Sequence, residues 1–233
     1  MKKIFEPYQI KLSDEQILKL NKYYQLLIEW NEKINLTSIT NYDEVVKKHF
    51  LDSALIMSTD IWKDNSINAV LDVGTGAGFP GMVLAILNPN IRFVLLDSLN
   101  KRIDFLDALM DELAIKNVET YHGRAEVYAR NEKFRNKFDF VVSRAVAELP
   151  VLMEYCIPFV KKNGYFVSYK GKKQEEELEK TKNAFRELDA SLGKVEKFNL
   201  QDNEERFLLF IKNDCETKDK YPRKEGKPKK KPL

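Results

Sequence analysis

Cysteine and histidine are scarce in this sequence of 233 residues, which contains two of each. The two cysteines, Cys156 and Cys215, form no pattern with each other or with His49 and His122 that is typical of a zinc site. We therefore expect neither a disulfide framework nor a metal centre. The sparse use of cysteine favours a reduced, cytoplasmic setting.

Long apolar runs are also missing. The N-terminus begins with two lysines, but Glu6 and Pro7 come before an apolar segment of signal-peptide length can form. The longest apolar stretch, residues 69–86, contains Asp72, four glycines and Pro80, which make it a poor membrane helix. The sequence predicts no secretion signal and no membrane contact.

Positive charge is present but unevenly distributed. The net charge is +3, yet residues 218–233 hold eight lysines and arginines against two acids, so the rest of the chain is net negative. Prolines interrupt this segment, which therefore cannot be helical throughout. Charge alone leaves two alternatives open, a segment that contacts a polyanion and a solubilising disordered end.

Helical patterns dominate the first 65 residues. Ser13 followed by Gln16 resembles a capping box, and the apolar residues after it recur at helical spacing over 14–31. A second pattern of the same period covers 41–58, beginning at Asn41. Residues 1–65 are therefore predicted to form an N-terminal helical cap.

From residue 69 onward, short apolar runs alternate with helical patterns. The predicted strands are 69–73, 92–97, 117–122, 138–143, 164–170, 194–200 and 206–212, and the predicted helices are 80–87, 101–115, 148–162 and 172–192. Such alternation predicts an α/β fold with a parallel, doubly wound sheet. The last two strands are separated only by the polar turn 201–205, which predicts a hairpin and one antiparallel strand.

A hairpin ending is typical of seven-stranded, Rossmann-like methyltransferase folds and is not expected of a six-stranded dinucleotide fold. We therefore divide the chain into a cap (1–65), a methyltransferase domain (66–213) and a basic tail (214–233). We expect a monomer.

Four glycines crowd the turn after the first strand. A turn of this kind lets backbone N–H groups and a helix N-terminus approach a ligand that a Cβ would block. Gly76, Gly78 and Gly81 fit the dinucleotide pattern G-x-G-x-x-G, whereas Gly74, Gly76 and Gly78 form G-x-G-x-G. The glycines alone leave both ligands open.

Three neighbours of the turn favour the second pattern. Asp72, at the strand end, suits the positively charged amino-acid end of S-adenosylmethionine, directly or through water, and would repel a pyrophosphate. Asp97 ends the second strand, where a carboxylate takes ribose hydroxyls, a feature that both ligands share. For Asp72 or Asp97 taken singly, ordinary turn capping is the alternative. The loop "GRAE" offers Glu126 and the backbone of Ala125 beside the expected adenine pocket. These residues favour S-adenosylmethionine as the cofactor.

With these pieces placed, the chain resembles the bacterial small-subunit ribosomal RNA methyltransferase G family, also called glucose-inhibited division protein B. The matching segments are "WNEKINLTSIT" (30–40), "HFLDSAL" (49–55), "LDVGTGAGFPG" (71–81), "LLDSLNKRIDFL" (95–106), "GRAE" (123–126), "VVSRAVAEL" (141–149) and "YPRKEGKPKKKPL" (221–233). The resemblance implies a seven-stranded class I S-adenosylmethionine-dependent methyltransferase fold and, as partner, 16S rRNA or the small ribosomal subunit.

The family resemblance also implies an activity and a set of contacts. The activity is methyl transfer from S-adenosylmethionine to N7 of a guanine in the 530 loop of 16S rRNA (guanine 527 in the family's rRNA numbering), with S-adenosylhomocysteine as product. By motif position, the cofactor contacts are Gly74, Phe79, Asp97, Ser98, Leu99, Ala125, Glu126 and Arg144. Where the family tail mostly has "KP", this chain has Glu225 and Gly226, which weakens any detailed assignment of the tail.

The implied chemistry agrees with the residues after the fourth strand. Guanine N7 attacks with an exposed lone pair and loses no proton, so no general base is required. The strand ends in "SRA" (143–145), not in the N-P-P-aromatic box used on exocyclic amines. We predict that Arg144 orients the cofactor carboxylate or guanine O6. The alternative for Arg144 is a structural salt bridge with Glu148 or Asp139.

Other candidates keep a structural alternative. His49 lies in a predicted helix and is more typical of an interface histidine than of a base, and His122 is expected to cap the "GRAE" loop. Phe79 either covers the cofactor or packs in the core. Lys170, followed by Lys172 and Lys173, suits contacts with RNA phosphates or a solvated helix start.

The tail is the main predicted RNA contact, through Arg223, Lys224 and the lysines of 227–231. Deleting residues 218–233 is then expected to weaken RNA binding, in a salt-dependent way, and to leave cofactor affinity unchanged. Rival interpretations are a methyltransferase acting on a small molecule or protein, an NAD-linked oxidoreductase, and an RNA-binding assembly protein with a vestigial pocket.

Overall fold

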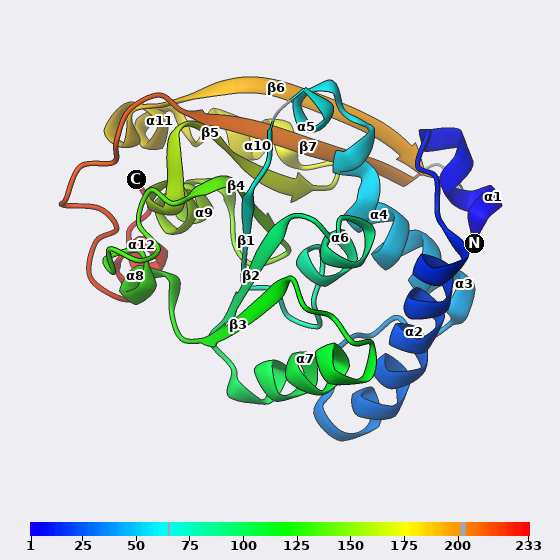
Figure 1. The fold of residues 1–233 in the computed structure, drawn as a ribbon. Coiled ribbons are helices and arrows are strands. Elements are labelled where there is room, and N and C mark those ends of the chain that lie inside the picture. The colour runs from blue at the N-terminus through cyan, green and yellow to red at the C-terminus, as the bar shows by residue number, and fades with distance from the viewer. Residues whose placement is uncertain (65, 201–203) are drawn as a thin grey trace.

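One mixed sheet organises the computed structural model, which describes residues 1–64, 66–200 and 204–233 (Figure 1). Its strands are β1 (Ala69–Val73), β2 (Arg92–Asp97), β3 (Val118–His122), β4 (Phe138–Arg144), β5 (Val160–Lys170), β6 (Ala190–Leu200) and β7 (Glu204–Asn213). They lie in the order β3-β2-β1-β4-β5-β7-β6, and β7 alone is antiparallel to both of its neighbours. The predicted fold and its antiparallel strand are confirmed, while residues 201–203 of the predicted turn lie outside the described residues.

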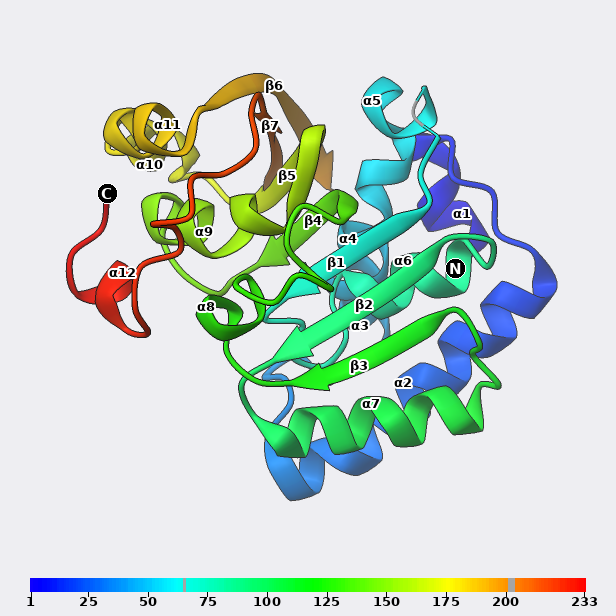
Figure 2. The ribbon, with the colours of Figure 1, turned by 60° about the vertical axis from the view of Figure 1, so that its left-hand side comes forward.

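Helices cover both faces of the sheet (Figure 2). They are α1 (Lys2–Phe5), α2 (Asp14–Ile34), α3 (Tyr42–Val45), α4 (Asp52–Ala54), α5 (Asp60–Lys63), α6 (Gly81–Leu87), α7 (Asn100–Glu112), α8 (Ala125–Tyr128), α9 (Leu149–Cys156), α10 (Gln174–Glu179), α11 (Lys182–Leu188) and α12 (Lys227–Lys230). Helices α2, α6 and α7 lie on one face, and α9, α10 and α11 lie on the other. The central strands are therefore buried on both faces, which explains their nearly continuous apolar runs.

Alternate residues of the strands belong to two separate hydrophobic cores, one on each face of the sheet; the core on the face that α9 covers is called the second core. On the face that α2 covers, Val70 and Phe93 pack in one cluster with the N-terminal helices. On the opposite face, Leu71 and Val94 pack with α9 and with Tyr221 of the tail. The N-terminal cap and the tail thus each share a core with the sheet.

The predicted first long helix is present as α2 and runs to Ile34. Its capping box is complete: the Gln16 N–H donates to Ser13 Oγ (3.2 Å), and the Ser13 N–H donates to Gln16 Oε1 (2.9 Å). Leu20, Tyr23 and Leu27 of this helix are fully buried. Helix α2 therefore forms the outer layer of one face.

The helix predicted over 41–58 is wrong as a single element. The chain instead passes through α3, a π-helical segment η2 (Val46–Leu51), α4 and a 3-10 segment η3 (Leu55–Ser58). A π-helical turn adds a residue per turn and is rare, so a 3.6-residue apolar period does not reveal it. The segments η2 and α4 carry His49 and Asp52 to the candidate site.

Two C-terminal elements also differ from prediction. The helix expected over 148–162 ends at Cys156, and a 3-10 turn η4 (Ile157–Phe159) leads directly into β5. The helix expected over 172–192 is two helices, because the Thr181 N–H bonds to Leu178 O (3.0 Å) and closes α10 early. Asp189 then ends α11 in the left-handed conformation (φ 50°), so β6 begins at Ala190.

The tail is packed against the domain, beside α8 and α9 (Figures 1 and 2). Tyr221 and Pro228 are buried, and Tyr221 Oη donates to Glu187 Oε2 (2.6 Å). Of the two alternatives that charge left open, a disordered end does not describe this segment.

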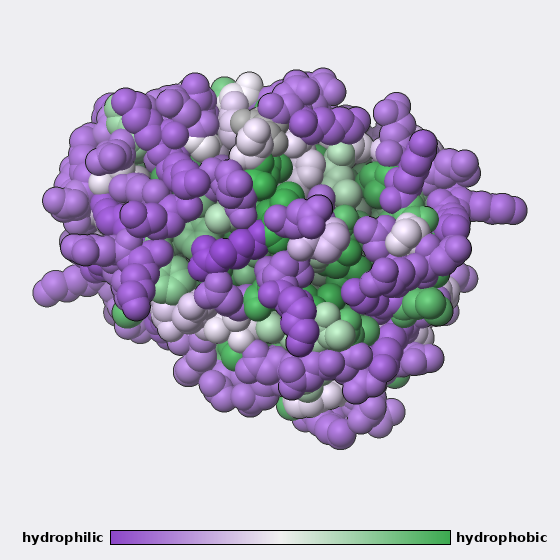
Figure 3. All heavy atoms as spheres, viewed as in Figure 1, coloured by the Kyte–Doolittle hydropathy of each residue, from purple (hydrophilic) through white to green (hydrophobic). Residues whose placement is uncertain are grey.

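Hydrophilic residues cover most of the face seen in Figure 3, and hydrophobic atoms show mainly near its centre. In the part of the chain that the structure describes, no helix combines the length and the apolar character that a bilayer crossing requires.

Candidate active site

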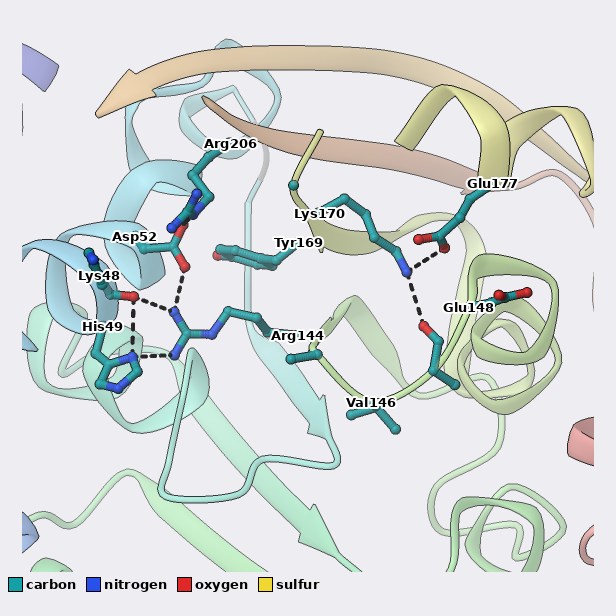
Figure 4. A pocket seen from close by; sticks show the side chains of 13 residues that line it. Lys48, His49, Asp52, Arg144, Val146, Glu148, Tyr169, Lys170, Glu177 and Arg206 are labelled. Atoms are coloured by element: carbon teal, nitrogen blue, oxygen red, sulfur yellow. Dashed lines mark hydrogen bonds and ion pairs between the residues drawn. The ribbon is translucent and has the colours of Figure 1, made fainter. Parts of the chain in front are cut away.

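Three adjoining pockets follow the edge of the sheet at which the parallel strands end. The first, of about 240 Å³, is called the tail pocket and is lined by Val73, Gly74, Leu96, Asp97, Ser98, Gly123, Arg124, Ala125, Glu126, Val146, Ala147, Val151, Tyr155 and Lys229. The second, of about 430 Å³, is the glycine pocket, lined by Leu36, Thr37, His49, Gly74, Thr75, Gly76, Ala77, Phe79, Asp97, Ser98, Arg102, Arg144, Ala145 and Val146. The third, of about 590 Å³, is the arginine pocket (Figure 4), lined by Lys48, His49, Asp52, Arg144, Ala145, Val146, Ala147, Glu148, Tyr169, Lys170, Gly171, Glu177 and Arg206.

The pockets share walls and meet after β4. Asp97 and Gly74 line the tail and glycine pockets, and Arg144 lines the glycine and arginine pockets. Val146 lines all three. The carboxyl ends of strands are where open α/β sheets bind ligands. The three pockets therefore lie side by side along this edge of the sheet.

The loop after β1, residues 74–80, is called the glycine loop, and its backbone requires glycine at several positions. Gly74, Gly76 and Gly78 have φ values of 73°, 60° and 93°, the left-handed region that glycine favours. A Cβ on Gly74 would collide with Val146, and one on Gly78 would lie 2.5 Å from Tyr23 Oη, whereas Gly76 faces open space. Gly76 therefore leaves room for a ligand, and Gly78 is needed for packing.

Gly81 has an ordinary backbone conformation, but a Cβ there would lie 2.8 Å from the Cβ of Asp72. This close approach makes Gly81 a packing glycine, a role that the third glycine of a dinucleotide pattern also has, so Gly81 does not distinguish the two patterns. The Gly81 N–H also donates to Asp72 Oδ2 (2.8 Å), which fixes the start of α6 on the end of β1.

Asp72 is completely buried beneath the glycine loop and lines none of the three pockets. Its Oδ1 has no hydrogen-bond partner among the described residues. Burial raises the pKa of this carboxyl to about 7, against an ordinary value of 3.8. The contact expected for Asp72, directly or through water, stays a prediction, and burial favours the one through water.

Asp97 ties the glycine loop to β2. Its Oδ2 accepts from the Gly76 N–H (2.8 Å), its Oδ1 accepts from the Leu99 N–H (2.9 Å), and Arg102 Nη1 lies 3.2 Å away. The carboxylate stands in the wall between the tail and glycine pockets, with lone pairs left for further donors. Ser98 lines both pockets, whereas the Leu99 side chain is exposed outside them.

Ala125 and Glu126 line the tail pocket, as expected for "GRAE". Glu126 is buried, and its Oε1 accepts from the Gly226 N–H of the tail (3.0 Å). The expected cap by His122 is wrong, because its Nε2 lies 3.2 Å from Ser98 O in the loop after β2.

Arg144 ends β4, and its guanidinium is held by the N-terminal cap (Figure 4). Nη1 donates to Asp52 Oδ2 (2.5 Å) and to Lys48 O (3.1 Å), and Nη2 lies 3.3 Å from His49 Nδ1. The salt bridge considered with Glu148 or Asp139 is therefore wrong. Asp139 instead pairs with Lys161 (2.7 Å).

Asp52 is the principal site residue that the sequence did not reveal. It is only 4% exposed, and its Oδ1 lies 3.3 Å from Arg206 Nε, so it bridges two arginines. The available signal was the segment "HFLDSAL", in which Asp52 follows His49 by three residues and so reaches the same helical face.

His49 lies between the cap and the site. Its Nε2 is 2.8 Å from Thr37 Oγ1, and its ring stacks on Phe79 with centroids 4.5 Å apart. Burial, and to a lesser degree the charge of Arg144, lower the pKa of His49 to about 3. The imidazole is therefore neutral near pH 7 and is a poor proton acceptor.

Phe79 is packed in the core and also lines the glycine pocket. Its ring is stacked between His49 and Tyr23, whose centroid is 5.5 Å away, and it is only 6% exposed. It also lines the glycine pocket, with the Arg144 guanidinium 5.2 Å from its ring centre. Core packing thus fixes a ring whose edge belongs to the site.

The three residues predicted to contact RNA differ in their surroundings. Lys170 Nζ pairs with Glu177 (2.6 Å) and donates to Ala147 O (3.0 Å). Arg223 pairs with the fully buried Glu154. Lys224 is exposed, and its side chain bonds to no residue that the structure describes. Of these three residues, only Lys224 has a charge that no described residue pairs.

Comparisons with known proteins give matches over most of the chain. A family model described as rRNA small subunit methyltransferase G (GidB) matches residues 16–207. A ribosomal RNA small subunit methyltransferase G from Lachnoclostridium phytofermentans is 50% identical over 95% of this chain and 91% of its own length. One from Lactococcus lactis is 45% identical over 97% of this chain and 94% of its own length.

Among solved structures, a SAM-dependent methyltransferase from Aquifex aeolicus has a TM-score of 0.54 at 18% identity. The match covers 73% of this chain and 93% of the other, which shows a shared fold. The fold is the class I, Rossmann-like fold of S-adenosylmethionine-dependent methyltransferases, as predicted. The sequence matches are more specific, and by them the chain belongs to the ribosomal RNA small subunit methyltransferase G family.

Proposed function

We propose that this protein transfers a methyl group from S-adenosylmethionine to N7 of a guanine in the 530 loop of 16S rRNA. The observation that carries the proposal is the row of adjoining pockets, in which two pockets at the glycine loop border a third, arginine-lined pocket at Arg144 and Val146. This arrangement suits an elongated cofactor across the first two pockets and a base in the third.

The residues present fit the cofactor. The left-handed glycines, with Gly76 facing open space, leave the room that an amino-acid moiety needs in the glycine pocket. Asp97 stands where ribose hydroxyls would donate to it, and Ala125 and Glu126 border the tail pocket beside the adenine. When bound, S-adenosylmethionine supplies an electrophilic methyl group, which N7 takes from sulfur in a displacement that leaves S-adenosylhomocysteine.

Arg144 is the residue to which we assign the orienting role. It stands between the glycine and arginine pockets, where its guanidinium reaches either a carboxylate or guanine O6. Asp52, Lys48 O and His49 restrict it to one position, so little side-chain entropy is lost when a ligand binds.

The protonation states of the site fit attack by N7. Forming the N7–carbon bond releases no proton, and the sulfonium charge passes to the purine ring. His49, with its pKa lowered to about 3, is unsuited to act as a general base at neutral pH. Asp52 is occupied by two arginines, and burial raises the pKa of Tyr169 well above its usual range.

Exposed lysines near the site support an RNA substrate. Lys172 and Lys173 follow β5 at the arginine pocket, and Lys224 lies on the tail. Contacts between such lysines and phosphates predict RNA binding that weakens steeply with salt. Raising the ionic strength should therefore increase the Michaelis constant for RNA far more than that for the cofactor.

The direct experiment uses small subunits that lack the modification, incubated with labelled S-adenosylmethionine. Borohydride and aniline cleavage followed by primer extension maps N7-methylguanosine. We expect a single stop in the 530 loop, and 16S rRNA freed of protein serves as a parallel substrate. A label at another atom or site would contradict the assignment.

Two rivals give different results in the same assay. Methyl transfer that survives ribonuclease treatment would indicate a small-molecule or protein substrate. Binding of NADH without binding of S-adenosylhomocysteine would indicate an oxidoreductase.

A further inference from the structure

The C-terminal segment 223–231 contributes one residue, Lys229, to the lining of the tail pocket. We propose that this segment belongs to the cofactor site, and that Lys229 donates a hydrogen bond to the adenine ring of the bound cofactor. The inference rests on the proposed function, because it places the adenosine end of the cofactor in the tail pocket.

Arg223 anchors the segment on α9 and also bonds to its far end. Arg223 Nε donates to Glu154 Oε1 (2.8 Å) and Nη2 donates to Oε2 (2.5 Å), and Glu154 is fully buried. The Arg223 N–H also donates to Glu154 Oε1 (2.7 Å). At the other end, Lys231 O accepts from Arg223 Nη2 (2.8 Å). One buried carboxylate therefore fixes the whole turn.

Between these ends the segment contacts the "GRAE" loop. The Gly226 N–H donates to Glu126 Oε1 (3.0 Å), and Arg124 Nε pairs with Glu225 (2.6 Å). Gly226 adopts φ 73°, which permits the turn that aims its N–H at the pocket. Glu225 and Gly226 are the two residues at which this tail departs from the family pattern, and here both contact the cofactor site.

Lys229 is exposed at the rim of the tail pocket, and its side chain bonds to none of the residues described in the structure. The other cation that lines this pocket, Arg124, is already paired with Glu225. Val151, Leu96 and Ala125 offer apolar contact to a flat ring. An adenine ring presents nitrogen acceptors at its edge, and an ammonium group has three protons to donate.

This placement reverses one expectation from the sequence. If the tail were only an RNA handle, its removal would leave cofactor affinity unchanged. Since Lys229 lines the tail pocket and the Gly226 N–H bonds to Glu126 in its wall, changes in the tail are instead expected to weaken cofactor binding in the absence of any RNA.

The test is isothermal titration of the full-length protein with S-adenosylhomocysteine, without RNA. We expect Lys229→Ala to raise the dissociation constant about 3- to 10-fold, the range of one hydrogen bond, and Lys229→Arg to restore most of the affinity. Lys230→Ala is the matched control, because Lys230 is the exposed neighbour that lines no pocket. Equal affinities for the wild type and Lys229→Ala would overturn the inference.

A second measurement needs no substitution. Binding is reciprocal, so a cofactor that contacts the tail must also stabilise the tail. We expect S-adenosylhomocysteine to slow tryptic cleavage within residues 223–231 of the wild-type protein several-fold. An unchanged cleavage rate at saturating ligand would overturn the inference, whereas a wild type that binds no S-adenosylhomocysteine would instead refute the proposed function.

Discussion

Arg144 shows how a single residue can depend on distant parts of the chain. Its guanidinium bonds to Asp52 and Lys48 from the N-terminal cap and lies over Phe79 of the glycine loop. Hydrogen bonds between ionised groups are short and strong, and misplacing an orienting group by an ångström is costly in rate. If Arg144 has the proposed orienting role, Asp52 is its positioning residue.

We predict that Asp52→Asn lowers kcat about 10- to 100-fold and changes the Michaelis constant for the small subunit less than 3-fold. Steady-state methyl transfer at saturating cofactor measures both quantities. Asp60→Asn, which removes a largely exposed carboxylate, should behave as the wild type. If the loss of activity merely followed a loss of folded protein in urea titrations, a positioning role would be refuted.

Asp72 couples protein stability to pH. Its pKa is about 7 in the folded state against an ordinary 3.8. Between about pH 4 and about pH 7, therefore, the folded state keeps the Asp72 proton and the unfolded state has released it. Its contribution to stability is therefore complete below about pH 4 and is lost as pH rises towards 7, by about 1.4 kcal/mol per pH unit.

Asp72→Asn has no such proton. We predict that its free energy of unfolding, relative to that of the wild type, increases by about 2–3 kcal/mol between pH 5 and pH 8. Urea unfolding at the two pH values checks this difference. Asp111→Asn, an exposed position on α7, should show none. A constant difference between Asp72→Asn and the wild type would mean that Asp72 is ionised throughout.

The sequence predicted site residues when their chemistry is local. The left-handed glycines and Asp97 could be predicted because they follow strand ends at short spacing, and the structure places them together. Asp52 could not be found in this way, because its partner Arg144 lies 92 residues away and no period connects the two.

At the scale of elements, α2 supports the glycine loop from outside. The buried Tyr23 Oη donates to Ala77 O within the loop, and the Tyr23 ring stacks on Phe79. A helix of the cap thereby fixes the backbone that the cofactor is proposed to contact.

We predict that Tyr23→Phe raises the dissociation constant for S-adenosylhomocysteine about 3- to 10-fold, because it leaves the Ala77 carbonyl buried and unpaired. Calorimetric titration provides the measurement. Tyr24→Phe is the matched control, since its hydroxyl bonds to Thr40 O (3.0 Å), away from the glycine loop. An equal effect of both variants would indicate general loosening of α2.

Elements were predictable where burial imposes a simple period. The central strands and α2 appear within a few residues of their predicted bounds. The segments 41–58 and 172–192 were not predictable as they are. The first contains a π-helical turn, and in the second α10 ends early at Thr181. Both features depend on backbone hydrogen bonds that leave the apolar pattern nearly unchanged.

At the scale of the whole molecule, the tail is part of the fold. Composition indicated a charged segment that suits a polyanion, and it could not indicate that α9 offers a fully buried carboxylate to Arg223. Burying one charge is tolerable only when an opposite charge and hydrogen bonds accompany it. The Arg223–Glu154 pair therefore ties the last residues of the chain to the second core.

We predict that Arg223→Met lowers the free energy of unfolding by about 3–5 kcal/mol, because Glu154 is left buried without its partner. Adding Glu154→Gln should restore most of the lost stability. The amide oxygen of the new glutamine carries no charge and still accepts a hydrogen bond from the backbone N–H of residue 223. Lys224→Met, at the exposed neighbouring position, should leave stability unchanged. Denaturant unfolding of these variants, at low and high salt, provides the measurement. If Arg223 served only RNA phosphates, Arg223→Met would match Lys224→Met in stability, and the double variant would gain nothing.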